Sequence, residues 1–219
     1  MVVDSSSTDR TEEICRNAGV GFEVKKWSGF AETKKYALQK TANDWVFWVD
    51  ADEALTEGLQ EEIRKFKESE PLFPIYKAAR RAYFLGRWIK HSGWYPGYVA
   101  RLFDKTKVSF NSNDVHEGLD FKGETGKLEN DLEHYTDLDI KHYYEKFNNY
   151  TSLAANELFK KGKSFGLAGL LIRPPFLFIK MYIFRLGFLD GIQGFILAVF
   201  SANYVFTKYA KLWELKRKE

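Results

Sequence analysis

An uninterrupted apolar run at residues 45–49 leads directly into two carboxylates, Asp50 and Asp52, and constrains the fold more than any other feature. Because polar and apolar residues do not alternate in this run, it predicts a strand buried on both faces, as in a parallel α/β sheet. Ligands of open α/β sheets bind just beyond the carboxyl ends of the strands. We therefore expect both aspartates at the rim of a binding crevice, where they can share one hard divalent cation that also contacts substrate phosphates.

The composition fits one packed domain, or one domain with an appended subdomain. The chain has 219 residues, of which 45% are hydrophobic and 29% charged, so a core can form and disorder is not expected. The formal net charge of +3 is too small to indicate a nucleic-acid partner, and we expect none. Cys15 is the only cysteine, which rules out a disulfide within the chain and fits a reducing compartment. We also expect no secretory signal, because no charged-then-apolar leader is visible.

Short apolar runs alternate with helical patterns over residues 1 to about 70, as in βαβ units. The pattern predicts strands ending near residue 3 and at 22–24 and 45–49, and helices at 9–18, at 29–41 and after Thr56. Residues 75–121 are more β-like, with expected strands at 75–84, 98–103 and 108–110. Residues 139–161 return to helical spacing. The predicted fold class is therefore α/β with a helical C-terminal extension.

The C-terminal third is apolar and basic. No Asp or Glu lies between Leu158 and Leu189, whereas the same stretch contains Lys160, Lys161, Lys163, Arg173, Lys180 and Arg185. Residues 191–209 are almost continuously apolar and come close to the roughly 20 residues that a spanning helix needs. A buried or oligomerising helix is one interpretation. An interfacial segment whose basic residues face anionic lipid is the other, and the recurring polar residues favour surface association over spanning.

Two motifs carry alternative interpretations. Asp50 could instead be the nucleophile of a phosphatase of the haloacid dehalogenase type. That class follows its aspartates with a Gly-Thr type turn, and Glu53-Ala54-Leu55 stands here instead, which counts against it. The turn at residues 2–9 fits a strand end with a helix cap, and it also places Asp4 where it can accept hydrogen bonds from a base or ribose.

A set of ordered motifs resembles family 2 glycosyltransferases with the GT-A fold. The motifs that carry this resemblance are residues 4–9, 29–38 and 44–53. Residues 93–96, 101–103 and 115–117 resemble the bacterial branch that adds sugars to the lipopolysaccharide core, and residues 187–191 and 208–212 extend the likeness to the C-terminus. The resemblance implies a GT-A-like, Rossmann-like domain with a mostly parallel sheet at residues 1–135. A helical, basic and apolar region that associates with membranes would follow at residues 136–219.

The resemblance also implies roles for the nucleotide and metal residues. Asp4 would contact the nucleotide base, and Lys34 would lie near the nucleotide. Asp50 would hold the ribose or the metal, and Asp52 would ligate Mg²⁺ or Mn²⁺ on the donor diphosphate. The family commonly has Asn after the basic residue, whereas this chain has Lys35.

Roles for the acceptor side follow in the same way. Glu117 would take the proton of the acceptor hydroxyl in an inverting transfer. His116 beside it would be an orienting residue or a metal neighbour, or else an ordinary loop histidine. The aromatic residues Trp88, Trp94 and Tyr95 would line the acceptor cleft or pack in the core. Arg101 would meet an acceptor phosphate or form a structural ion pair.

The implied activity is sugar transfer from a nucleotide-diphosphate donor to a lipopolysaccharide-core or other lipid-linked saccharide acceptor. The implied location is cytoplasmic, peripheral on the inner face of the cytoplasmic membrane. The chain begins within the family's pattern, so the first strand of the fold is expected to be missing, beside the strands that start near Val2 and Trp45. A truncated, inactive relative that only binds a membrane or a partner is therefore the non-catalytic alternative.

Overall fold

The computed structural model describes residues 1–110, 119–163 and 166–218. It contains two compact units whose chain segments interleave. Unit 1 consists of Met1–Trp48, Ser69–Lys77 and Ala100–Lys127, and unit 2 consists of Val49–Glu68, Ala78–Val99 and Leu128–Glu219. The strands β5 (Ile75–Phe84) and β7 (Gly97–Asp104) contribute residues to both units.

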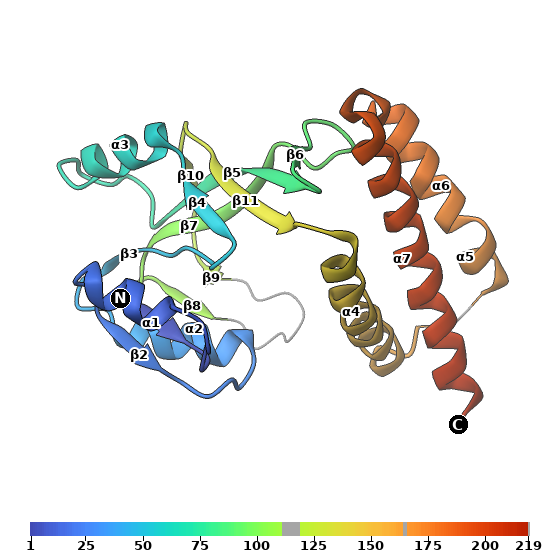
Figure 1. Ribbon diagram of the computed structural model, residues 1–219, viewed down its shortest axis with the longest axis horizontal. Helices are drawn as coiled ribbons and strands as arrows, with labels where there is room; N and C mark the ends of the chain where they lie inside the picture. Colours follow the sequence, from blue (N-terminus) through green and yellow to red (C-terminus); the bar gives the residue numbers. More distant parts are fainter. Residues whose placement is uncertain (111–118, 164–165, 219) are drawn as a thin grey trace. The chain divides into compact units, whose positions relative to one another are not determined.

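Unit 1 contains three small groups of strands and two helices (Figure 1). Its elements are β1 (Val2–Asp4), α1 (Thr11–Asn17), β2 (Phe22–Val24), α2 (Phe30–Gln39), β3 (Trp45–Phe47), β8 (Val108–Phe110), β9 (Leu119–Phe121) and β10 (Gly126–Lys127). The pairs β1–β2 and β10–β5 are parallel, and the pairs β3–β7 and β8–β9 are antiparallel. The predicted order of strands and helices over the first 48 residues is confirmed, with shorter bounds.

Local chemistry explains where the two helices of unit 1 begin. The Asp9 carboxylate accepts a hydrogen bond from the Thr11 backbone N–H at 3.0 Å, ahead of α1. Gly29 precedes α2 with a φ of 101°, a conformation that a residue without a Cβ adopts at little cost. The acidic residues Glu12 and Glu13 lie in the first turn of α1, where the helix dipole favours negative charge.

The predicted strand at residues 45–49 is only partly as expected. It forms as the shorter β3, its residues are half-buried, and Val49 beyond it is 43% exposed. The prediction of a strand buried on both faces among parallel neighbours is therefore wrong, since β3 pairs antiparallel with β7. The apolar pattern has another cause: Trp45 packs on Tyr76 at 6.3 Å between ring centroids, and Trp48 packs on Phe103 at 5.1 Å.

Unit 2 contains part of a seven-stranded mixed sheet and most of the helices. The strands run in the order β4 (Glu53–Leu55), β11 (Leu132–Asp137), β5 and β6 (Arg87–Trp88). Strand β11 is antiparallel to β4 and parallel to β5. The helices are α3 (Glu57–Phe66), α4 (Ile140–Lys160), α5 (Leu167–Leu171), α6 (Arg173–Ile179) and α7 (Gly191–Arg217), with a π-helical turn at Lys180–Phe184 and a 3₁₀ turn at Gly187–Asp190.

Two helices of unit 2 begin at the side-chain caps that their sequences supply. The Thr56 hydroxyl accepts a hydrogen bond from Leu59 N at 3.3 Å, which confirms the predicted start of α3. The Asp139 carboxylate accepts one from His142 N at 2.7 Å at the start of α4. Each cap satisfies a backbone donor that the helix itself leaves unpaired.

The core of unit 2 lies between the C-terminal end of β5 and the long helices. Its buried members are Phe84, Ile89, Met181, Leu197 and Ala198. Helix α7 runs beside α4 and α6 (Figure 1). The helix crosses the preceding 3₁₀ turn so closely that a Cβ on Gly194 would overlap the carbonyl oxygen of Gly187. Only glycine permits this backbone approach.

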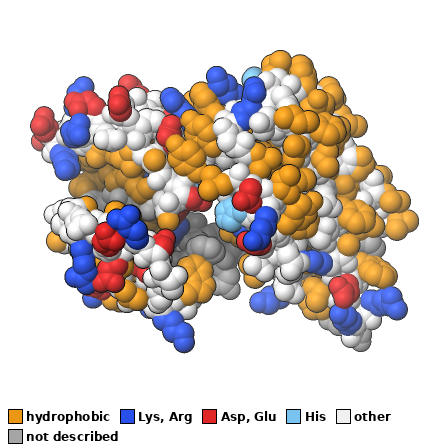
Figure 2. Space-filling model, in the orientation of Figure 1, with side chains coloured by type: hydrophobic (Ala, Val, Ile, Leu, Met, Phe, Trp, Pro, Cys, Tyr) orange, Lys and Arg blue, Asp and Glu red, His pale blue; other side chains and the backbone are white. Residues whose placement is uncertain are grey.

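The C-terminal helices leave many apolar side chains exposed. On the face shown in Figure 2, hydrophobic side chains gather over α5–α7. By length and composition, one helix of the described residues, Gly187–Arg217, is apolar enough to cross a membrane, and 22% of its most apolar window is buried. Soluble core helices also pass this test, so it is weak support for spanning. The domain boundary at residues 135/136 stays a prediction.

Candidate active site

The two aspartates of the predicted metal site lie in the turn that leads into β4. Glu53 N donates to the Asp50 carbonyl oxygen at 3.0 Å and closes the turn, while the Glu53 carboxylate accepts from Asp50 N at 3.2 Å. Tyr135 N donates to the Asp52 carbonyl oxygen at 2.8 Å. Backbone hydrogen bonds thus fix the turn to β11, so the Asp52 side chain is not needed to hold the turn in place.

The Asp52 carboxylate lies against the side chain of His134 on β11, and the charge of Lys146 also acts on it. His134 Nε2 lies 3.3 Å from Asp52 Oδ2, and the side chains are 18% and 41% exposed. The hydrogen bond from His134 lowers the pKa of Asp52 below its ordinary value, so this carboxylate is ionised at neutral pH. An ionised, half-exposed carboxylate retains lone pairs for a further ligand.

Sequence reasoning missed His134, because the stretch that forms β11 was not predicted to be a strand. The signal was weak. Residues Leu132 and His134 face the same side of the strand, and Glu133 and Tyr135 face the other, so the alternation does not separate polar from apolar residues cleanly.

The donor set fits a cation that takes part of its shell from a substrate. Over residues 1–110, 119–163 and 166–218, no group of three or more His, Cys, Asp or Glu side chains is arranged to hold a metal ion. Mg²⁺ is commonly bound by one or two carboxylates, substrate phosphates and water rather than by an all-protein cage. Asp50 and Asp52 match that pattern by type and spacing.

The predicted nucleotide residues Asp4 and Lys34 belong to unit 1. Asp4 ends β1, is 9% exposed, and accepts hydrogen bonds from Ser7 N at 2.7 Å and Ser7 Oγ at 2.6 Å. These bonds lower the pKa of Asp4. Asp4 therefore lies at a strand end within a turn, as expected, whereas the N-cap residue of α1, Arg10, makes no side-chain cap bond. The contact of Asp4 with a base stays a prediction.

Lys34 on α2 lies over the ring of Trp48, with its ammonium nitrogen 4.9 Å from the ring centroid. The Arg101 guanidinium lies 5.9 Å from the centroid of the same ring, and Arg101 is only 6% exposed. Unit 1 thus brings Lys34 and Arg101 together around one tryptophan. Both interpretations of Arg101, contact with an acceptor phosphate and a structural ion pair, stay predictions.

The predicted catalytic pair, Glu117 and His116, lies outside the described residues. Their roles as base and orienting residue stay predictions. Among the three candidate acceptor aromatics, Trp94 packs edge-on against the buried Phe84 at 6.3 Å and belongs to the core of unit 2. Trp88 and Tyr95 contact each other edge to face at 5.4 Å.

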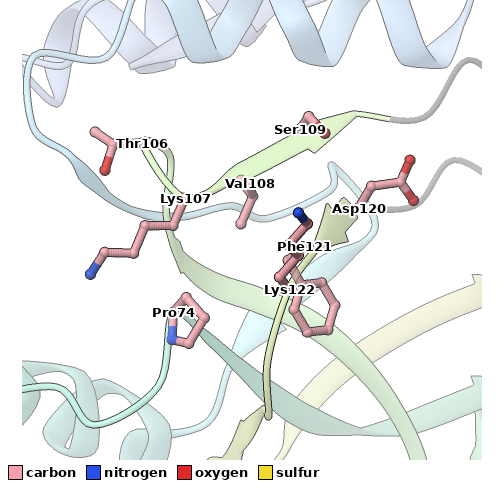
Figure 3. A pocket seen from close by; sticks show the side chains of 8 residues that line it. All are labelled: Pro74, Thr106, Lys107, Val108, Ser109, Asp120, Phe121 and Lys122. Carbon is pink, nitrogen blue, oxygen red and sulfur yellow. The ribbon is translucent and has the colours of Figure 1, made fainter.

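Unit 1 also contains an open pocket beside β8 and β9, none of whose lining residues was predicted to bind donor or metal. Figure 3 shows the side chains that line it: Pro74, Thr106, Lys107, Val108, Ser109, Asp120, Phe121 and Lys122. The lining contains two lysines, Lys107 and Lys122, and one acidic residue, Asp120.

Taken together, the described residues define an α/β protein with an acidic turn suited to a hard cation. Comparison with known proteins gives the family. The Glycosyl transferase family 2 profile matches residues 1–118. The lipopolysaccharide core biosynthesis glycosyltransferase LpsC of Rhizobium meliloti (strain 1021) is 31% identical over 98% of this chain and 82% of its own length. An uncharacterised glycosyltransferase of Rickettsia typhi is 32% identical over 100% of this chain and 78% of its own length.

The chain belongs to glycosyltransferase family 2. It is therefore an enzyme with the GT-A fold. Enzymes of this family use a nucleotide-sugar donor and a saccharide acceptor. The family assignment decides against the phosphatase interpretation of Asp50.

Proposed function

We propose that this glycosyltransferase moves a sugar from a nucleoside-diphosphate donor to a lipopolysaccharide-core or other lipid-linked saccharide, with a divalent cation held by Asp50 and Asp52. The observation that carries the proposal is the half-exposed Asp52 carboxylate, which lies against His134 in a turn fixed to β11. When bound, Mg²⁺ or Mn²⁺ would neutralise charge that develops on the leaving diphosphate.

The residues of the chain divide the remaining work. His134 orients the Asp52 carboxylate, and Lys34 and Asp4 face the nucleotide. Glu117 accepts the proton of the acceptor hydroxyl. At the same time the hydroxyl oxygen bonds to the anomeric carbon of the sugar, and the bond from that carbon to the diphosphate oxygen breaks. Attack from the face opposite the leaving group inverts the anomeric configuration.

The acceptor class is supported by two independent features. The relative LpsC is named as an enzyme of lipopolysaccharide core biosynthesis. The helices of unit 2 also expose apolar side chains in a stretch without acidic residues: Leu171 is 60%, Ile172 62%, Phe176 59% and Phe184 70% exposed.

A lipid surface accounts for this exposed apolar stretch. Arg173, Lys180 and Arg185 lie among the apolar residues and are exposed. Apolar side chains that enter the acyl boundary, together with cations that meet anionic headgroups, are the features of an interfacial helix. We therefore place the enzyme on the inner face of the cytoplasmic membrane, where a lipid-linked acceptor is within reach.

Transfer is tested with a panel of nucleoside-diphosphate sugars and a lipid-linked core saccharide, with and without chelator. Asp52→Asn should lower metal-dependent transfer by about 10²–10³, whereas Glu145→Gln, an exposed change on α4, should leave it intact. Transfer that is insensitive to both the chelator and Asp52→Asn would overturn the metal-assisted mechanism.

Membrane association is tested by sedimentation with phosphatidylglycerol vesicles and with phosphatidylcholine vesicles. The double change Phe176→Ser and Phe184→Ser should reduce binding to the anionic vesicles. Leu72→Ser is the matched control, because Leu72 is an 86% exposed apolar residue of unit 1. Equal loss in both variants, or no binding by the wild type, would contradict the lipid surface.

A further inference from the structure

One face of the unit 2 sheet carries an unusual set of aromatic and charged side chains. The strand register places Arg81 opposite Glu133 and Tyr83 opposite both Tyr135 and Trp88. Alternate residues of β5, including the fully buried Phe84, point to the core instead. The set therefore lies on the side of the sheet away from that core.

Two cations converge on the ring of Trp88. The Arg81 guanidinium carbon lies 5.0 Å from the ring centroid, and the Lys90 ammonium nitrogen lies 4.5 Å from it. Arg81 Nε donates to the Asp131 carboxylate at 2.7 Å. Within the described part of the chain, Lys90 forms no ion pair. Arg81 is thus paired with Asp131, and the second carboxylate of this face, Glu133, accepts from the hydroxyls of Tyr83 and Tyr135. The Lys90 ammonium is the cation of this face that no described carboxylate pairs.

The position of Lys90 is set by a buried carboxylate. The backbone N–H groups of Lys90 and His91 donate to Asp190 at 3.2 and 2.9 Å, and His91 Nδ1 lies 3.0 Å from the same carboxylate. Asp190 is 1% exposed and directly precedes α7. The loop that holds the lysine is therefore ordered before any ligand arrives, which lowers the entropy cost of binding.

A flat aromatic surface lies next to these cations. The rings of Tyr83 and Tyr135 stack at 5.0 Å with planes 18° apart, and both hydroxyls donate to Glu133. Tyr135 is 39% exposed, so the side of its ring away from Tyr83 is accessible. The backbone N–H of Tyr135 also donates to the Asp52 carbonyl oxygen, so Tyr135 is adjacent to the acidic turn.

We propose that this aromatic–cationic face, made of Arg81, Tyr83, Trp88, Lys90 and Tyr135, binds an acceptor saccharide that carries an oxyanion, either a carboxylate or a phosphate. Tyr135 supports the apolar face of a sugar ring, and Arg81 and Lys90 receive the oxyanion. This inference rests on the proposed transfer function, because it gives the chemistry of the acceptor for that reaction.

The aromatic rings of this face have different roles. Cations already cover Trp88, so it holds Arg81 and Lys90 in place rather than stacking on sugar. Arg81 uses Nε for Asp131, and its terminal N–H groups make no hydrogen bond to another described residue. A guanidinium edge and an ammonium together suit the several acceptor oxygens of a carboxylate or phosphate.

The test measures binding to the full chain without donor, by ligand-observed NMR titration. The probes are methyl glucoside, methyl glucoside 6-phosphate and methyl glucuronide. At least one charged probe should bind about tenfold more tightly than the neutral glucoside, as for a gain of one charge-assisted contact. The two charged probes distinguish a phosphate from a carboxylate.

Lys90→Gln should remove most of the preference for the charged probe, while Lys141→Gln, at an 87% exposed lysine of α4, should leave it unchanged. Tyr135→Ala should weaken all three probes together, because it removes the shared platform. Thermal unfolding of each variant shows whether the fold persists, and Lys90 is exposed enough that its exchange should not alter it.

Equal binding of neutral and charged probes, no binding of any probe, or an unchanged preference in Lys90→Gln would overturn the inference. Failure of the transfer function is seen separately. Asp52→Asn should lose metal-dependent nucleotide binding and keep the charged-probe preference, so either proposal can fail while the other holds.

Discussion

Two aspartates that follow short strands show how differently the same sequence feature can be used. Asp4 ends β1 in unit 1, and Asp52 precedes β4 in unit 2. Asp4 is 9% exposed, and each of its oxygens accepts a bond from Ser7, at 2.6 and 2.7 Å. The Asp52 side chain is 41% exposed and lies 3.3 Å from His134.

The two aspartates differ in how much of each carboxylate remains open to a ligand. The pKa of each carboxylate is lowered, by Ser7 for Asp4 and by His134 for Asp52, so both are ionised at neutral pH. However, both oxygens of Asp4 already accept bonds from Ser7, whereas the Asp52 side chain, which lies against His134, is 41% exposed. More of the Asp52 carboxylate than of the Asp4 carboxylate is therefore open to a further ligand.

The sharpest way to break this comparison is to neutralise each aspartate. Asp52→Asn should lower turnover by about 10²–10³, the loss typical of removing one electrostatic stabiliser from a transferase-type transition state. Asp4→Asn should lower stability more than turnover at saturating donor, because its bonds hold a turn. Steady-state kinetics with thermal unfolding separate the two effects. Wild-type turnover in Asp52→Asn would place the ligand-binding carboxylate elsewhere.

The role of His134 gives a smaller effect. His134→Ala should weaken metal affinity about tenfold, since a residue that orients a metal-bound carboxylate typically contributes that much. His134→Gln, which keeps an N–H donor, should recover part of the loss. Metal titration of nucleotide binding is the measurement. A purely structural histidine would instead change the unfolding temperature and leave the metal titration curve in place.

The elements that the sequence predicted well are those with local signals. The Thr56 cap and the glycine before α2 each depend on a few neighbouring residues. The extent and partner of β3 were not predictable, because an aromatic-rich run looks the same whether sheet layers or neighbouring rings cover it. Strands β4 and β11 were missed because each is stabilised by pairing with the other across a long stretch of chain.

The candidate site shows the same limit. Asp50 and Asp52 stand out because their spacing is visible within a few residues. His134 is far from them in sequence and contacts Asp52 only through the β4–β11 pairing. The cations at Trp88 were also missed, since the tryptophan was expected either to line the acceptor cleft or to pack in the core. Which side chain covers a ring is decided by strand register, and register depends on pairings distant in sequence.

The Asp4 turn gives a third, smaller effect. Ser7→Ala removes the hydroxyl donor at 2.6 Å and should lower the free energy of unfolding by about 1 kcal/mol, the usual net value of one such bond. Ser7→Thr retains a hydroxyl and is the matched control. Denaturant unfolding at neutral pH measures the change. Turnover per folded molecule should stay at the wild-type level, and a large fall in it would assign Asp4 to the chemistry after all.

The smallest expected effect is the pH dependence of that same loss. The Ser7 hydroxyl and then the Ser7 backbone N–H lower the pKa of Asp4 below its ordinary value of 3.8. A group whose pKa is lowered by folding adds stability that is fully present above the unfolded-state pKa and is lost as the pH falls through the folded-state pKa. The stability difference between wild type and Ser7→Ala should therefore be full at neutral pH and should shrink below about 3.8 as Asp4 protonates. Carboxyl-carbon NMR of Asp4 should show its pKa move upward in Ser7→Ala, and a difference in stability that is constant down to acid pH would mean that Ser7 acts on the turn backbone rather than on the charge of Asp4.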